Sequence, residues 1–230
     1  MSVSSRPSGS ERPAFITSFT RAGAALALAA LLAACSTGSL FDSDTPVPAN
    51  YVLAAAPAAQ ASRTSLQVDV AISRPDMAAG LDTDRIAVLR GRELDYYRRV
   101  RWGSRSLEVV QNLVVDSLEN QKIFRSVTPE QARVAGDYVL DLQVRDFQAQ
   151  YTPRSDTPNV HVTFVGRLIR VSDRQLVTTV QSEARVEAED NRMSAVAAAF
   201  EAAAHRATLD LGAQVAAAVE GDTAARNAAL

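Results

Sequence analysis

Three long stretches in which apolar and polar residues alternate limit most strongly the folds open to this chain. They cover residues 138–144, 160–171 and 176–187. A period of two is typical of β-strands that bury one face and expose the other. In the third stretch the buried face is expected to begin with Leu176. The second half of the chain is therefore expected to form a twisted sheet whose strands follow each other as antiparallel neighbours.

Two other segments have the spacing of amphipathic helices. In residues 105–121 apolar side chains recur every three or four positions, and Ser104 or Ser106 is placed to cap the first turn. Residues 193–220 carry a similar apolar stripe and many alanines, which favour helix and allow close packing on a sheet. Gly221 is expected to end this second helix.

Shorter strands complete the pattern. Phe147 falls out of phase with the strand before it, which predicts a β-bulge near Arg145-Asp146. The order of strands, helix, strands and helix indicates an α+β domain, with a largely antiparallel twisted sheet and two amphipathic helices packed on one face. The shorter strands are expected at residues 51–53, 66–72, 85–90, 93–98 and 123–127, with a tight turn at Gly91-Arg92.

The N-terminal part of the chain has a different character. An apolar run follows Arg21 and ends in Leu32-Ala33-Ala34-Cys35. A charged leader, a short apolar core and small residues before a cleavage point are typical of a secretory signal peptide. The run is too short for an ordinary transmembrane helix. The alternatives are a plain signal peptide with a chance cysteine and a short buried apolar helix.

Leu-Ala-Ala-Cys resembles the bacterial lipobox. The resemblance implies that the Cys35 thiol takes a diacylglycerol, that a peptidase cuts before it, and that the new amino group is acylated. Two or three acyl chains make a stable membrane anchor. Cys35 is the only cysteine, so an internal disulfide is excluded.

Removal of residues 1–34 would leave a mature chain of 196 residues, 230 minus 34, which suits one domain. Its 21 basic and 25 acidic residues give a net charge of about −4, and nothing in this balance indicates a nucleic-acid partner. Residues 35–49 are rich in Gly, Ser, Asp and Pro and are expected to form a flexible tether with a span of about 20 Å. The domain is then expected at residues 50–221 and a frayed C-terminal tail at 222–230.

The sequence contains no recognisable catalytic, metal or cofactor motif. There is no Gly-x-Ser-x-Gly, P-loop or Gly-x-Gly-x-x-Gly. Neither His161 nor His205 has metal-ligand spacing to other candidate ligands, so structural roles are expected for both. The sequence therefore shows no evident nucleophile, metal site or nucleotide cradle, and no cofactor is expected.

One segment has the composition of an interface. Residues 96–102 contain the only tryptophan together with tyrosines and arginines, which are enriched at interface hot spots. The alternative is that Trp102 fills the core at a strand–helix junction and that the arginines are solvated. The candidate partner-interface residues are Tyr96, Tyr97, Arg99, Arg101 and Trp102.

Several of these features together resemble the ABC-type transport auxiliary lipoprotein family, which includes the PqiC-like proteins. They are the lipobox, Tyr51-Val52-Leu53, the strand Arg-Ile-Ala-Val-Leu-Arg, a Leu-x-Tyr-Tyr segment and Arg-Trp ahead of an amphipathic helix. The resemblance covers roughly residues 50–220. Two positions depart from the family pattern. Leu81 replaces a common aromatic residue, and Gly103 follows the tryptophan where a small residue or alanine is usual.

This resemblance implies a non-enzymatic lipoprotein subunit of a lipid-transport system. The implied partners are a periplasmic MCE-domain protein (mammalian cell entry) and ABC transporter or permease components, and homo-oligomers are compatible with it. Ser36 follows the cysteine where an aspartate would favour the inner membrane, which implies the periplasmic side of the outer membrane. The alternative function is a free-standing envelope lipoprotein that binds a small amphiphile.

Overall fold

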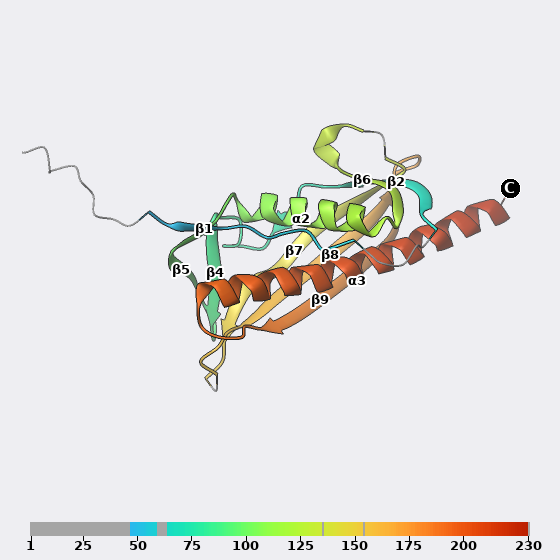
Figure 1. The fold of residues 1–230 in the computed structure, drawn as a ribbon. Coiled ribbons are helices and arrows are strands. Elements are labelled where there is room, and N and C mark those ends of the chain that lie inside the picture. Colours follow the sequence, from blue (N-terminus) through green and yellow to red (C-terminus); the bar gives the residue numbers. More distant parts are fainter. Residues whose placement is uncertain (1–46, 59–63, 135, 154, 230) are drawn as a thin grey trace, which may run out of the picture. The chain divides into compact units, whose positions relative to one another are not determined.

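The computed structural model describes residues 47–229, except for 59–63, 135 and 154 (Figure 1). The signal peptide, Cys35 and nearly all of the predicted tether therefore lie outside the described residues. The α+β class is confirmed. The elements are β1 (Ala49–Tyr51), β2 (Leu66–Ile72), β3 (Asp76–Met77), β4 (Arg85–Arg90), β5 (Glu93–Trp102), α2 (Ser106–Gln121), β6 (Phe124–Pro129), the 3-10 helix η2 (Glu130–Ala132), β7 (Tyr138–Tyr151), β8 (Asn159–Arg170), β9 (Gln175–Glu187) and α3 (Met193–Ala228).

Strand β7 organises the sheet. Along one side it pairs antiparallel with β8, which in turn pairs antiparallel with β9. Along its other side it pairs in succession with β2, β3 and β4, each of them parallel. Beyond β2 the next strand in the sheet is β6, and beyond β4 the next strands are β5 and then β1. The β2–β6 pair and the β4–β5–β1 group therefore lie at opposite ends of β7.

The sheet is mixed, although its two longest pairings, β7–β8 and β8–β9, are antiparallel as predicted. Among the described residues, the parallel pairings are β1–β5, β2–β6 and those of β7 with β2, β3 and β4. The pairings of β7 with β2, β3 and β4 and of β2 with β6 are parallel because the strands are joined by long connections that include α2. A parallel pair needs such a crossover, and the periodicity of a strand does not reveal its partner.

The β-bulge predicted near Arg145-Asp146 is confirmed by a register shift between β7 and β8. The Arg145 guanidinium donates to Gln143 Oε1 and Gln181 Oε1, at 3.4 and 3.3 Å. These two glutamines flank Val165 in the register of the sheet. Val165 is buried there on the face away from α3, beneath polar side chains of the neighbouring strands.

A second register shift corrects one strand prediction. Leu168 is aligned with Thr178, but Ile169 is aligned with Leu176, so Val177 is an extra residue in β9. Because side chains alternate between faces, this extra residue turns Leu176 away from the face that Leu168 shares with the core. Leu176 is 54% exposed, and its predicted place on the buried face is wrong.

Helices α2 and α3 lie side by side over the same face of the sheet (Figure 1). The approach of α3 to β8 is close, because a Cβ atom on Gly166 would lie 3.2 Å from Leu211 Cδ1. The core lies between this helix layer and the sheet. Its largest fully buried side chains include Phe147, Phe164, Phe200, Ile72, Ile86, Leu118, Leu140, Leu142 and Leu211.

The start of α2 differs from the prediction. The N-cap residue is Arg105, which makes no side-chain cap hydrogen bond, so the predicted serine cap is wrong. Ser106 is instead the first residue of the helix, and its hydroxyl donates to the carbonyl oxygen of Leu81. The Ser106 side chain thus ties the helix to the loop before β4, and a core contact replaces the cap.

The end of α3 also differs. The helix continues past Gly221 to Ala228, into the segment predicted to be a frayed tail. The Asp222 carboxylate accepts hydrogen bonds from Tyr138 Oη at 2.8 Å and from Arg170 Nη1 at 2.5 Å. These contacts with β7 and β8 hold the C-terminal turns against the sheet, which outweighs the tendency of a glycine to end a helix.

The alanine-rich segment after β1 lies across both helices. Its Ala54 N–H donates to Glu201 Oε2 at 2.7 Å, and its Ala54 carbonyl accepts from His205 Nε2 at 2.7 Å. Two residues later, the Ala56 N–H donates to Ser117 Oγ of α2 at 2.9 Å. His205 therefore has a structural role: it holds the segment after β1 against α3.

Candidate functional site

The predicted interface segment lies in the second half of β5, and its five residues have different surroundings. Trp102 is 3% exposed, and its ring centroid lies 5.6 Å from that of Phe147 and 5.1 Å from that of Phe200. These aromatic contacts join β5 to β7 and α3. Trp102 therefore fills the core at the strand–helix junction, as the alternative interpretation of the sequence held, and it offers little surface to a partner.

Tyr96 is half-buried and packs on the loop before β4. Its hydroxyl donates to the carbonyl oxygen of Gly80 at 2.8 Å, and the Arg85 guanidinium lies 3.9 Å from the centre of its ring. A cation over an aromatic face is attracted by the ring's quadrupole. Tyr96 thus presents an arginine-covered ring at the surface of the hairpin.

Tyr97 belongs to a chain of hydroxyl contacts. Its Oη lies 3.2 Å from Tyr151 Oη, and Tyr151 Oη donates to Asn191 Oδ1 at 2.5 Å, so Tyr97 is the donor to Tyr151. Burial raises the pKa of the Tyr97 phenol above its usual range, and the hydrogen bond with Tyr151 raises it further. The neutral phenol joins β5 to β7 and to the loop before α3.

Sequence reasoning missed Tyr151 and Asn191, which lie 54 and 94 residues after Tyr97. An open groove of about 390 Å³ adjoins Tyr151, and Leu89 and Arg90 at the end of β4 also line it. The Arg90 guanidinium lies 4.9 Å from the centre of the Tyr151 ring. The groove combines apolar, aromatic and cationic surface, which suits the binding of a small amphiphile.

Arg99 and Arg101 are both exposed. Arg101 Nη1 lies 3.0 Å from Asp84 Oδ2. Arg99 has a φ of +60°, a left-handed conformation that is uncommon for a residue with a side chain. Arg99 lies in a bulge of β5. Arg85 is aligned with Arg101 and Ala87 with Tyr96, so the single residue 86 of β4 faces residues 97–100 of β5. The structure thus separates the five candidates: Trp102 points inward, and the two arginines lie at the surface.

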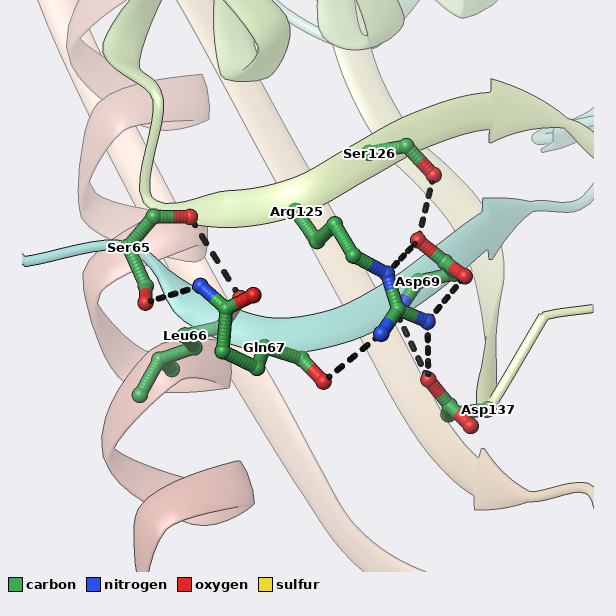
Figure 2. Close-up of polar contacts among 7 residues, drawn as sticks. All are labelled: Ser65, Leu66, Gln67, Asp69, Arg125, Ser126 and Asp137. Carbon is green, nitrogen blue, oxygen red and sulfur yellow. Dashed lines mark hydrogen bonds and ion pairs between the residues drawn. The ribbon is translucent and has the colours of Figure 1, made fainter.

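A second polar cluster lies where β2, β6 and the start of β7 meet (Figure 2). The Arg125 guanidinium lies between Asp69 and Asp137. Its Nε donates to Asp69 Oδ1 at 2.8 Å, its Nη2 contacts both carboxylates, and its Nη1 donates to the Gln67 carbonyl at 3.2 Å. Ser126 Oγ also donates to Asp69 Oδ1, at 2.7 Å.

Backbone contacts complete this cluster. The Asp69 N–H donates to Asp137 Oδ2, and the Asp137 N–H donates to the Asp69 carbonyl, both at 2.8 Å. The hydrogen bond from Arg125, followed by that from Ser126, lowers the pKa of the Asp69 carboxyl below its ordinary value. Asp69 therefore stays ionised with its oxygens occupied, and the cluster acts as a clamp that joins three strands.

His161 lies in a third polar network, on the face of the sheet away from α3. Its Nδ1 lies 3.2 Å from Gln150 Nε2, and its Nε2 lies 3.0 Å from Glu183 Oε1 and 3.1 Å from Thr163 Oγ1. The assigned Gln150 amide donates to Nδ1, so Nε2 carries the proton and donates to Glu183. In this tautomer Nε2 accepts no hydrogen bond from the Thr163 hydroxyl, and the His161 ring is held by contacts with side chains of β7, β8 and β9.

In the part of the chain that the structure describes, no group of three His, Cys, Asp or Glu side chains is placed to hold a metal ion. No described helix combines the length and apolar character needed to cross a membrane. Cys35 lies outside the described residues, so its acylation stays a prediction.

Comparison with known sequences identifies the family. The sequence model of the ABC-type transport auxiliary lipoprotein component matches residues 51–212, which is most of the chain. The chain belongs to this family. Members of this family are auxiliary components of ABC-type transport systems. The resemblance predicted from the sequence is confirmed. No curated protein matches the sequence at a comparable level.

Solved structures show the same fold at low sequence identity. Protein XCC0632 from Xanthomonas campestris, a DUF330 protein, is 22% identical, with a TM-score of 0.67 over 75% of this chain and 98% of that one. An uncharacterized protein of known structure is 11% identical, with a TM-score of 0.57 over 74% of this chain and 99% of that one. At these sequence identities the two structures show that the fold is shared, and nothing more.

Proposed function

We propose that this auxiliary lipoprotein is anchored by an acylated Cys35 to the periplasmic side of the outer membrane and positions a lipid-transport assembly there. Its partners are an MCE-domain protein and ABC transporter or permease components that move lipids or other hydrophobic compounds. The observation that carries the proposal is the family match over residues 51–212, with a lipobox-like Leu32-Ala33-Ala34-Cys35 upstream of it.

The arrangement of polar groups supports positioning over bond chemistry. The Arg125–Asp69–Asp137 clamp and the Tyr97–Tyr151–Asn191 contacts use their polar atoms within the protein. His161 is likewise committed to neighbouring side chains. On this proposal the protein is not an enzyme, and its surface grooves and exposed arginines contact a partner or the membrane.

The anchor is tested by Cys35→Ser in cells fed an acyl-chain probe. Wild-type protein should carry the probe and fractionate with the outer membrane, whereas the variant should be unlabelled and leave that fraction. Labelling that persists in Cys35→Ser would show that the anchor assignment is wrong. Wild-type protein that carries the probe but fractionates with the inner membrane would instead overturn the outer-membrane location alone.

The alternative function, a free-standing lipoprotein that binds a small amphiphile, is favoured by the open groove beside Leu89 and Tyr151. Organic extraction and mass spectrometry of purified protein distinguish the two. A stoichiometric amphiphile, lost when a Leu89→Asp substitution makes the groove polar, would support the alternative. Its absence, together with recovery of transport components from membranes, would support the positioning role.

A further inference from the structure

The positive charge of this protein is concentrated in one segment. Residues 82–105 contain seven arginines and four acidic residues, a net charge of +3. The rest of the chain from Cys35 onward contains 14 basic and 21 acidic residues, a net charge of −7. All seven arginines of the segment, which covers β4, β5 and their flanks, are exposed. A charge distribution this uneven creates a local positive field on an acidic protein.

Five of these seven arginines have no carboxylate partner among the described residues, and two of the five, Arg85 and Arg90, lie over the rings of Tyr96 and Tyr151. Arg101 pairs with Asp84, and Arg105 with Asp82, so those charges are largely compensated. Among the residues that the structure describes, Arg92, Arg98 and Arg99 take part in no ion pair. We call Arg92, Arg98 and Arg99 the β5 arginines.

The backbone holds Arg99 in an unfavourable conformation at this place. Its φ of +60° lies in the left-handed region, where a side chain costs free energy relative to glycine. The bulge that contains Arg98 and Arg99 interrupts the regular alternation of β5. Arg133 and Arg174 share the left-handed conformation, so it is the bulge that distinguishes Arg99 from them.

Two of the β5 arginines, Arg98 and Arg99, lie where the chain from Cys35 enters the fold, and Arg92 lies in the turn before β5. β1 runs parallel to β5, and Ala49 is aligned with Val100, the residue after Arg99. Thirteen residues lie between Cys35 and Ala49. A chain of this length reaches at most about 50 Å when fully extended. An anchor at Cys35 would therefore keep this end of the domain near the bilayer surface.

We propose that the β5 arginines bind the phosphate groups of anionic phospholipids in the membrane that holds the anchor. This proposal rests on the acylation of Cys35 in the proposed function. Guanidinium groups match phosphate oxygens in charge and in bidentate geometry. Each arginine near an anionic surface contributes about fivefold in affinity. The contacts form within one anchored molecule, so individually weak binding is sufficient.

The proposal gives the domain an orientation. β4 pairs with the end of β7, and β2 pairs with its beginning, so β5 and β6 lie toward opposite ends of the sheet. With the β5 arginines on phospholipid, the end that carries β6 and the β8–β9 turn points away from the membrane. That end is then free to meet a periplasmic partner.

A vesicle-binding experiment tests the proposal. The mature chain with Cys35→Ser, which carries no acyl group, is mixed with vesicles of phosphatidylcholine alone or with about 30% phosphatidylglycerol. It should bind only the phosphatidylglycerol vesicles, and high salt should abolish the binding. Combined Arg92→Gln, Arg98→Gln and Arg99→Gln substitutions should weaken this binding by on the order of a hundredfold.

A matched variant controls for net charge. Arg133, Arg174 and Arg226 are exposed and take part in no ion pair among the described residues. They belong to the far end of the domain, beside η2, in the β8–β9 turn and near the end of α3. Their combined change to glutamine removes the same charge and should leave vesicle binding within about twofold of wild type. Unchanged circular dichroism and thermal midpoints confirm that both variants fold.

Two results would overturn the proposal. One is an equal loss of vesicle binding in the β5-arginine variant and in the matched control. The other is equal vesicle binding by the wild type and the β5-arginine variant. If that variant also recovers fewer transport components from cells, the arginines are assigned to a protein partner. The vesicle assay contains neither an acyl anchor nor a transport component. Its failure therefore leaves the proposed function standing, and failure to recover transport components leaves the vesicle result standing.

Discussion

Gly212 of α3 lies so close to Leu118 of α2 that a Cβ atom on the glycine would be 2.4 Å from Leu118 Cδ2. A real Cβ does not approach another carbon to that distance, so the two helices meet here because position 212 has no side chain. Leu118 is itself fully buried. This contact fixes the spacing of the helix layer that covers the sheet.

Gly212→Val should therefore destabilise the protein by about 1–3 kcal/mol, because the added side chain forces α2 and α3 apart. Gly221→Ala in the same helix is the matched control, since a Cβ there meets nothing within 4 Å. That change should stabilise the helix by up to about 1 kcal/mol. Urea unfolding followed by circular dichroism measures both. Equal effects of the two substitutions would show that the close contact with Leu118 is not required.

The Asp222 contacts predict a dependence of stability on acid. Burial alone would raise the pKa of the Asp222 carboxyl, but hydrogen bonds from Tyr138 and Arg170 outweigh it and hold the pKa below the ordinary value of 3.8. A carboxyl with a lowered folded-state pKa contributes stability above its unfolded pKa and loses it as the pH falls. The thermal midpoint should therefore drop between about pH 5 and pH 2.

Asp222→Asn should make this decline shallower and should lower the midpoint near neutral pH, where the charge of wild-type Asp222 is fully present. Asp69, Asp173 and Asp190 also have pKa values lowered by neighbouring arginines, so part of the slope should remain. Differential scanning calorimetry across this pH range provides the measurement. A slope identical to that of the wild type would contradict the role assigned to Asp222.

The burial of Trp102 predicts a core response to substitution. Trp102→Ala should destabilise the protein by about 3–5 kcal/mol, because it opens a cavity against Phe147 and Phe200. Trp102→Phe should cost less. Arg101→Gln, at the exposed neighbour, should change stability by no more than about 0.5 kcal/mol. Denaturant unfolding followed by circular dichroism compares them. Trp102→Ala with wild-type stability would return this residue to the list of exposed interface candidates.

The Figure 2 cluster predicts a difference between two aspartates with arginine partners. Asp69→Asn weakens contacts with Arg125 and Ser126 that join β2 to β6, whereas Asp141→Asn affects a more exposed pair with Arg167. The thermal midpoint should fall more for Asp69→Asn, and the difference should shrink in high salt. A larger loss for Asp141→Asn would contradict the clamp.

Most elements of the fold could be predicted from the sequence because their signals are local. The alternation in residues 138–187 identified β7, β8 and β9, and Phe147 out of phase identified the bulge. The directions of pairing could not be predicted in this way. Whether β2 and β4 run parallel to β7 depends on connections through α2, which leave no trace in the strands' own periodicity.

Where the predictions failed, contacts between distant residues decided the outcome. Gly221 is a local signal for a helix end, but Asp222 finds Arg170 and Tyr138 across the sheet, and α3 continues. The Arg125–Asp69–Asp137 clamp joins charged residues that look like ordinary solvated positions in the sequence. The interface segment had the right composition, but the burial of Trp102 depends on aromatic rings from β7 and α3.

The most direct test of the central claim is quantitative affinity purification of the tagged full-length protein from detergent-solubilised membranes. Mass spectrometry then compares the recovered proteins with those from Cys35→Ser and from an unrelated tagged lipoprotein. The proposed function predicts that MCE-domain and ABC transporter or permease components are specifically enriched with the wild type, and depleted when the anchor is removed. Recovery of none of these components, under conditions that keep other envelope transport complexes intact, would contradict it.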